Sequence, residues 1–193
     1  MRRRLARLPR PLRIAIDWAV TIAGAVLVVL ALKTYVVTPY RIPSASMEPT
    51  LHCTRPTSSC EARFADRVLA CRICLGFSSP ARGDIVVFQA PPEAERRCGE
   101  GGTFVKRLIG LPGETVTEKN GLVFVDGRRL EEPYVKYRDA QTGAWHVPEG
   151  KYFFMGDNRP QSCDSRQWGS VPRSDLIGTV AVRYWPPNRI GIP

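Results

Sequence analysis

A single apolar run near the N-terminus constrains this chain more than any other feature. Residues 14–37 contain only two charged side chains, Asp17 near one end and Lys33 near the other, with 15 uncharged residues between them. A membrane-spanning helix needs about 20 mostly apolar residues, and charged side chains near its ends can reach the interface. Trp18 and Tyr35 fall where interfacial aromatic residues are typical. The run therefore predicts a transmembrane anchor over residues 14–37.

The net charge of +10 is concentrated ahead of this run. Residues 1–13 hold six arginines and no acidic residue, so residues 14–193 carry a net charge of +4. Basic residues before a spanning segment place the N-terminus in the cytoplasm, so the chain after Val37 is expected outside. A cleaved secretory signal fits a similar pattern, but no small-residue cleavage site follows the apolar run, and an uncleaved anchor is favoured. The charge indicates a lipid bilayer as partner and does not indicate a nucleic acid.

Residues 38–193 predict a mainly β domain of ordinary size. The chain has 17 prolines and 16 glycines, which separate short apolar runs. Asn120-Gly121 and Asp126-Gly127 predict type I′ hairpins, because both central positions of that turn need positive φ. A meander is therefore expected over residues 114–132, and residues 91–102 are expected to form a loop. Strands are expected at 38–42, 66–73, 84–90, 103–110, 114–120, 122–127, 128–132, 152–156 and 178–186.

Six cysteines, an even number, favour disulfides if the domain is extracytoplasmic. Cys53 and Cys60 are expected to close the loop that follows residue 51. Cys71 and Cys74 stay unassigned; their spacing could supply half of a zinc site, but the chain has no second C-x-x-C. The sequence also lacks a glycine-rich phosphate loop and an H-E-x-x-H motif, so no cofactor and no metal is expected.

The stretch RIPSASMEPTL, residues 41–51, places two serines two positions apart directly after the apolar run. A serine hydroxyl is a poor nucleophile until a base removes its proton. Histidine is the usual base, but neither His52 nor His146 comes with an obvious carboxylate to orient it. If one of these serines, Ser44 or Ser46, is a nucleophile, another residue must therefore act as its base.

Lys106, in the stretch FVKRLIG, is the alternative base. On a strand it shares a face with Phe104 and Leu108, while Arg107 points the other way. Burial among apolar side chains lowers the pKa of a lysine, because it penalises the ammonium form. A lysine with a pKa near the working pH can act as a general base.

Four blocks occur in a fixed order behind the apolar run: SASMEPTL (44–51), RGDIVVF (82–88), FVKRLIGLPGE (104–114) and MGDNRPQSCDSRQWGSVP (155–172). With these blocks the chain resembles bacterial type I signal peptidases, which are membrane-anchored serine–lysine proteases. The resemblance spans essentially the whole chain. It implies an extracytoplasmic peptidase domain over residues 38–193 with a signal-peptidase-like (LexA-like) β-fold. The implied substrates are exported preproteins, which are cut at A-x-A-like sites close to the bilayer. The protein export machinery is the other implied partner.

The resemblance also implies roles for individual residues. Ser46 would be the nucleophile, Lys106 the general base, and the Ser46 N–H with the Ser44 hydroxyl would hold the oxyanion. Ser162 would orient the lysine, and Asp164, Arg166 and Asp157 would support the site. The small substrate pockets would be lined by Ile42, Pro43, Met47, Leu51, Phe104 and Val105.

The last block departs from the family pattern. Related proteins often read GDNRDNS where this chain has GDNRPQS, with Pro160 and Gln161, and Cys163 follows the lysine-orienting serine directly. We expect Cys163 to be paired, with Cys98 as the suggested partner. Three alternatives stay open from the sequence: a self-cleaving LexA-like protein, a protease dedicated to one exported substrate, and a non-catalytic anchored β-domain that binds envelope peptides.

Overall fold

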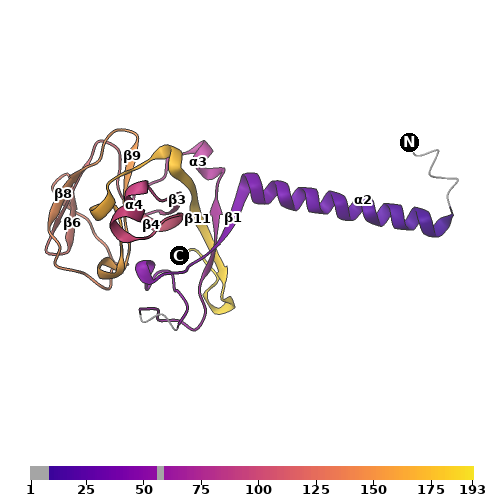
Figure 1. Ribbon diagram of the computed structural model, residues 1–193, viewed down its shortest axis with the longest axis horizontal. Helices are drawn as coiled ribbons and strands as arrows, with labels where there is room; N and C mark the ends of the chain where they lie inside the picture. Colours follow the sequence, from indigo (N-terminus) through magenta and orange to yellow (C-terminus); the bar gives the residue numbers. More distant parts are fainter. Residues whose placement is uncertain (1–8, 56–58) are drawn as a thin grey trace.

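The computed structural model describes residues 9–55 and 59–193, so Arg2, Arg3, Arg4 and Arg7 of the predicted basic cluster lie outside the described residues. Helix α2 (Arg10–Ala31) projects away from the rest of the protein as a single rod (Figure 1) and has no buried residue. Its 22 residues are about 33 Å long, enough to cross a hydrocarbon core of about 30 Å. Length and composition make it the one candidate membrane span among the described residues. The helix begins at Arg10 rather than Ile14, and a π-helical turn, η1 (Leu32–Val36), carries the helical path on to the first strand.

The remainder is mainly β, as the sequence predicts, and all strand pairs are antiparallel. The larger sheet has the order β1-β2-β11-β3-β4-β9-β10. Its strands are β1 (Val37–Arg41), β2 (Arg67–Cys71), β3 (Ile85–Gln89), β4 (Thr103–Gly110), β9 (Lys151–Met155), β10 (Val171–Pro172) and β11 (Leu176–Trp185). Strand β1 continues directly from η1, so α2 is joined to an edge of this sheet (Figure 1).

The smaller sheet has the order β7-β6-β5-β8 and lies at the end of the domain farthest from α2 (Figure 1). Its strands are β5 (Thr115–Lys119), β6 (Leu122–Val125), β7 (Arg128–Arg129) and β8 (Gly143–His146). The predicted hairpins are confirmed: φ is 50° and 74° at Asn120 and Gly121, and 48° and 77° at Asp126 and Gly127. The strand predicted over 128–132 is only two residues long.

Several short elements were not predicted. Helix α4 (Pro92–Cys98) replaces the loop expected over residues 91–102, and strands β8 and β10 arise where no strand was expected. The termini of α4 carry ordinary helix signals: proline at its first position, acidic residues in its first turn, and Gly99 after its end with φ of 68°. The strand predicted over 66–73 ends early, at Cys71, and the helical turn α3 (Cys74–Phe77) comes after it. The short helix α5 (Ser165–Trp168) lies within the last motif block.

One buried cluster packs the larger sheet against α4 and α5, and a second lies between the two sheets. Phe88 of β3 stacks on Phe154 of β9 with ring centroids 4.5 Å apart, and Trp168 of α5 packs 6.0 Å from Phe88. The central position of β3 explains its sequence IVVF, in which every side chain is buried. This packing fixes β4, which carries Lys106, between β3 and β9.

All six cysteines lie in the described residues and all are paired. The expected pairs Cys53–Cys60 and Cys98–Cys163 are both present, and Cys71 pairs with Cys74. The C-x-x-C spacing therefore forms a disulfide between the end of β2 and the start of α3, and not half of a zinc site.

Candidate active site

Ser46 lies in a single 3-10 turn, η2 (Ala45–Met47), which begins four residues after the end of β1. Pro43 ahead of the turn favours an extended backbone for the residue before it. Ser46 is 6% exposed, and its carbonyl oxygen accepts a hydrogen bond of 3.1 Å from the backbone N–H of Asn158. The Ser44 and Ser46 hydroxyl oxygens are 3.3 Å apart. The two hydroxyls are therefore neighbours, with Ser44 on the exposed side.

Lys106 lies in β4 opposite Val86 of β3 and is 4% exposed. Its ammonium position is 5.7 Å from the centre of the Phe104 ring, on the same strand face. Burial lowers the pKa of Lys106 from 10.5 to about 8, although the nearby carboxylates of Asp164, Glu100 and Asp157 raise it in part and Arg166 lowers it further. At pH 7 about a tenth of such lysines are neutral and able to accept a proton.

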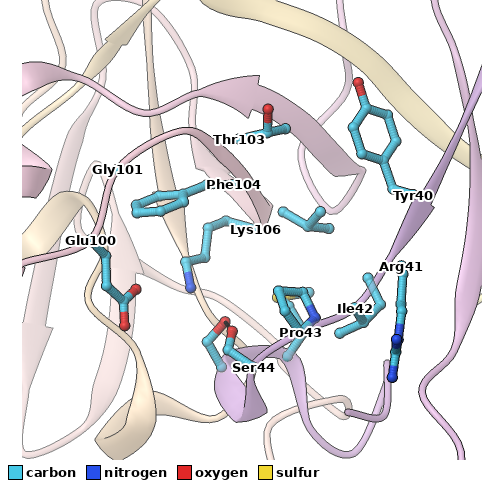
Figure 2. Close-up of a pocket in the computed structure, with 13 residues that line it drawn as sticks. Tyr40, Arg41, Ile42, Pro43, Ser44, Glu100, Gly101, Thr103, Phe104 and Lys106 are labelled. Carbon is cyan, nitrogen blue, oxygen red and sulfur yellow. Dashed lines mark hydrogen bonds between the residues drawn. The ribbon is translucent and has the colours of Figure 1, made fainter. Parts of the chain in front are cut away.

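One pocket of about 370 Å³ joins the two segments. Its wall includes residues 40–44, 46 and 47 from the first segment and residues 100, 101 and 103–106 from the second. Figure 2 shows the Lys106 side chain reaching into this pocket toward Ser44, with Arg41 and Ile42 on one side of it and Glu100 on the other. The structure thus brings the two predicted catalytic residues, 60 positions apart in sequence, to one cavity.

Five of the six predicted pocket residues line this cavity: Ile42, Pro43, Met47, Phe104 and Val105. Leu51 does not. It is fully buried and packs with Ile42 and Met47 in a core cluster, so it supports the wall from behind.

Ser162 is buried, and its hydroxyl has no hydrogen-bond partner among the described residues. The expected hydrogen bond to Lys106 is therefore not made in this structure. Gly156 faces the same place, because a Cβ there would collide with Ser162 Oγ and with the Ser46 carbonyl oxygen. Only glycine allows the last motif block to approach the Ser46 segment this closely.

Asp164 and Arg166 form the ion pair implied by the resemblance, through contacts of 2.9 and 3.0 Å. Asp164 also caps α5, and it accepts a hydrogen bond of 3.1 Å from the Gly156 N–H. A carboxylate with this many donors is held in one position. The pair therefore fixes the backbone on both sides of Ser162.

Asp157 lies beside the site without facing the pocket. It accepts two hydrogen bonds from Arg107, of 2.8 and 2.6 Å, and one of 2.6 Å from the Thr50 hydroxyl. Arg107 and Lys106 are neighbours on β4 with side chains on opposite faces. The Asp157 carboxylate therefore ties the strand of Lys106 to the segment of Ser46.

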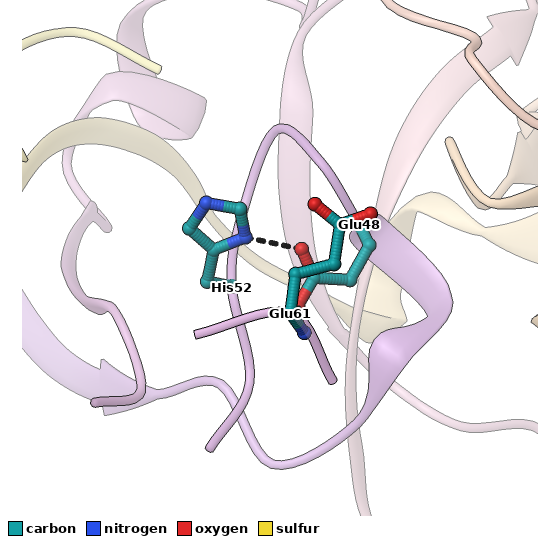
Figure 3. Close-up of side chains that lie close together, drawn as sticks. All are labelled: Glu48, His52 and Glu61. Atoms are coloured by element: carbon teal, nitrogen blue, oxygen red, sulfur yellow. Dashed lines mark hydrogen bonds and ion pairs between the residues drawn. The ribbon is translucent and has the colours of Figure 1, made fainter. Parts of the chain in front are cut away.

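The group Glu48, His52 and Glu61 brings possible metal-ligand atoms within 4.8 Å of one another (Figure 3). Each member already has a protein partner: Glu48 binds the His52 ring and the Cys53 N–H, and Glu61 accepts from the Tyr137 hydroxyl at 2.6 Å. These contacts hold the Cys53–Cys60 loop against the segment that follows Ser46. We assign the group to structure, and the pocket that Ser46 and Lys106 share contains no such group of three possible metal ligands among the described residues.

Comparisons with known proteins show the family of this chain. The family model described as signal peptidase, peptidase S26, matches residues 15–185. The chain belongs to this signal peptidase family. A signal peptidase I of Leptolyngbya laminosa is 41% identical over 174 residues, which cover 89% of this chain and 80% of the relative. Signal peptidase IB of Staphylococcus aureus is 32% identical over 190 residues, covering 89% and 90%. A solved signal peptidase I structure from Enterococcus faecalis is 34% identical and covers 54% of this chain and 98% of that one, with a TM-score of 0.46.

Two residues beside the site of this signal peptidase family member, Arg107 and Glu100, were not predicted from the sequence. The alternation along the strand placed the Arg107 side chain on the face opposite Lys106. It did not reveal the ion pair with Asp157, because that partner is 50 residues away in the sequence. Glu100 gave no signal, because it lies in residues 91–102, which were expected only to form a loop. The disulfide Cys98–Cys163 joins this segment, two positions before Glu100, to the residue after Ser162. Glu100 is thereby held at the mouth of the pocket.

Proposed function

We propose that this chain is a membrane-anchored serine endopeptidase that removes signal peptides from exported preproteins through a Ser46–Lys106 dyad. The proposal rests first on one observation: a buried lysine with a pKa lowered to about 8 shares a single pocket with a buried serine. Membership of the signal peptidase family supports the substrate class, and the relatives are named signal peptidases I. Within residues 9–55 and 59–193, no histidine lines that pocket.

In the proposed reaction neutral Lys106 takes the Ser46 proton as Ser46 Oγ attacks the scissile carbonyl carbon. The Ser46 N–H and the Ser44 hydroxyl hold the resulting oxyanion; a donor of this kind contributes about 100- to 1000-fold in rate. The C–N bond then breaks, and the Lys106 ammonium gives its proton to the leaving amine. Lys106 next takes a proton from water, and the resulting hydroxide attacks the carbonyl carbon of the Ser46 ester. The C–Oγ bond then breaks, Lys106 returns the proton to Ser46 Oγ, and the acyl product leaves with a free carboxyl group. Ser162, whose hydroxyl is free, would orient the Lys106 amine in this cycle.

The free edge of β4 offers a place for an extended substrate. Strand β9 pairs with Arg107, Leu108 and Gly110 only, so Thr103 to Lys106 pair with β3 and leave their other edge open. Residues 40–44 line the same pocket opposite this edge. A substrate strand added there would place alternate side chains against Ile42, Met47 and Phe104. These bulky walls leave room for small side chains, which supports A-x-A-like cleavage sites.

The family is membrane-associated, and the orientation is part of the proposal. Arginines before and at the start of α2 favour a cytoplasmic N-terminus and an extracytoplasmic pocket. Preproteins that leave the protein export machinery would then meet the pocket close to the bilayer surface. We propose the bacterial cell membrane as the site of action.

The decisive experiment offers the purified full chain, in lipid, a preprotein with an A-x-A site. Wild type should cleave it, whereas Ser46→Ala and Lys106→Ala should not; Ser174→Ala and Lys151→Ala, at exposed positions, serve as matched controls. If Lys106→Ala cleaved the preprotein as fast as wild type, Lys106 could not be the general base. Binding without cleavage by wild type would favour a non-catalytic peptide-binding domain, and cleavage of only one preprotein in a panel would favour a dedicated protease.

A further inference from the structure

A short turn beside the end of α2 carries apolar side chains that folding leaves uncovered. We define the α3 turn as residues 72–78, which contain α3. Phe77 is 87% exposed and Ile73 is 40% exposed. Single exposed apolar residues are common on protein surfaces. The position and the rigidity of this turn set these two apart.

The α3 turn is hydrogen-bonded to η1, the segment that follows α2. The Arg72 N–H donates a hydrogen bond of 2.9 Å to the carbonyl oxygen of Val36, the last residue of η1. Val37, the first residue of β1, pairs with Cys71. Figure 1 shows α3 beside the place where α2 meets the domain. If α2 spans the bilayer, the turn lies at the depth of the lipid headgroups.

Two features on neighbouring residues agree with that depth. Tyr35, one residue before Val36, is 71% exposed, and aromatic residues of this kind are typical of the membrane–water interface. Arg72 in the turn is exposed as well, and a basic side chain at this depth can meet anionic headgroups. The turn thus combines apolar side chains with a cation, as interfacial segments do.

The turn is also rigid. The Cys71–Cys74 disulfide closes it at the base, and Ser78 donates hydrogen bonds to the Cys74 carbonyl oxygen from both its N–H and its hydroxyl. From the other side of the turn, the Arg173 guanidinium donates a hydrogen bond of 2.8 Å to the Leu75 carbonyl oxygen. A rigid turn loses little conformational freedom when it binds, so its exposed side chains are prepared for a partner.

We propose that the α3 turn is a second membrane contact, which inserts Phe77 and Ile73 among the lipid headgroups and upper acyl chains. The inference rests on the proposed function only in that α2 must span the bilayer. With one contact the domain could rotate about the axis of α2. With two, the pocket of Ser46 keeps one orientation toward the membrane in which a signal peptide lies.

The test uses the full chain reconstituted in lipid vesicles. A tryptophan at position 77, Phe77→Trp, is compared with Arg129→Trp, an exposed position on β7 in the sheet farthest from α2. The native tryptophans are common to both variants, so the difference spectrum reports the added one. Lipids brominated near the headgroup should quench the added emission of Phe77→Trp at least twofold more than that of Arg129→Trp, with a shift to shorter wavelength. Equal quenching in the two variants would overturn the proposal.

A second readout separates this contact from catalysis. Phe77→Asp should slow cleavage of a preprotein embedded in the same vesicles several-fold, while a short water-soluble A-x-A peptide is cut at the wild-type rate. Arg129→Asp is the control, and unchanged cleavage of the embedded preprotein by Phe77→Asp would contradict the proposal. If wild type cuts neither substrate, the proposed function fails, but the quenching experiment still decides whether the turn enters the membrane.

Discussion

Replacing Lys106 with methionine should abolish cleavage and yet stabilise the fold near neutral pH. Lys106 is almost completely buried, and burial lowers its pKa from 10.5 to about 8. One pKa unit corresponds to about 1.4 kcal/mol, so keeping the ammonium buried costs the folded state about 3 kcal/mol at pH 7. Methionine has a similar unbranched shape and no charge to desolvate.

The pH dependence gives this prediction its sign. Between pH 8 and 10.5 the folded protein binds fewer protons at Lys106 than the unfolded chain does, so its stability rises with pH across this window. The cost of the ammonium is fully present below pH 8 and is gone above 10.5. The advantage of Lys106→Met should therefore be largest at pH 7 and should shrink toward pH 10.5.

Thermal unfolding of the full chain in detergent, followed by tryptophan fluorescence, measures the effect. For a protein of this size about 3 kcal/mol corresponds to a rise in Tm of about 6–12 °C at pH 7. Lys151→Met, at an exposed position, is the control and should shift Tm little at either pH. The reasoning is refuted if Lys106→Met melts no higher than this control at pH 7, or if its gain at pH 10 equals that at pH 7.

Three further outcomes follow from the geometry of the pocket. Glu100→Gln removes a carboxylate that raises the pKa of Lys106, so the acidic limb of the pH–rate profile should move to lower pH; an unmoved limb would contradict this. Ser44→Ala should lower kcat about 100- to 1000-fold with little change in KM, and a loss under tenfold would exclude Ser44 as an oxyanion donor. Gly156→Ala should lower the free energy of unfolding by about 1–3 kcal/mol and should also lower kcat, because the added Cβ would collide with the Ser46 carbonyl oxygen. Wild-type thermal stability together with wild-type kcat would contradict this prediction.

Local rules account for the parts of the fold that were predicted correctly. Asn-Gly and Asp-Gly need no distant partner to favour positive φ, so both hairpins could be located from sequence. The apolar run is long enough to require a helix in a bilayer, whatever follows it. Alternation along β4 separated Lys106 from Arg107 before any contact was known.

Short elements escaped prediction because tertiary contacts stabilise them. Helix α4 has only seven residues, too few to be stable alone, and it forms with Ala94 buried in the core and its end joined by the Cys98–Cys163 disulfide. Strand β10 consists of two residues that pair with β9. Nothing within such short segments distinguishes them from loops.

The sequence by itself determined the family blocks, the apolar N-terminal helix, the mainly β class and the residue types available for catalysis. Only the tertiary structure decided what those residues can do. Burial beside β3 sets the pKa of Lys106, and the close approach of Gly156 to the Ser46 segment sets the position of the buried Ser162 hydroxyl. The exposure of Phe77 beside the end of α2 was likewise invisible in the sequence. A pKa, a cavity and an uncovered side chain each depend on which distant segments pack together, and that packing is a property of the whole fold.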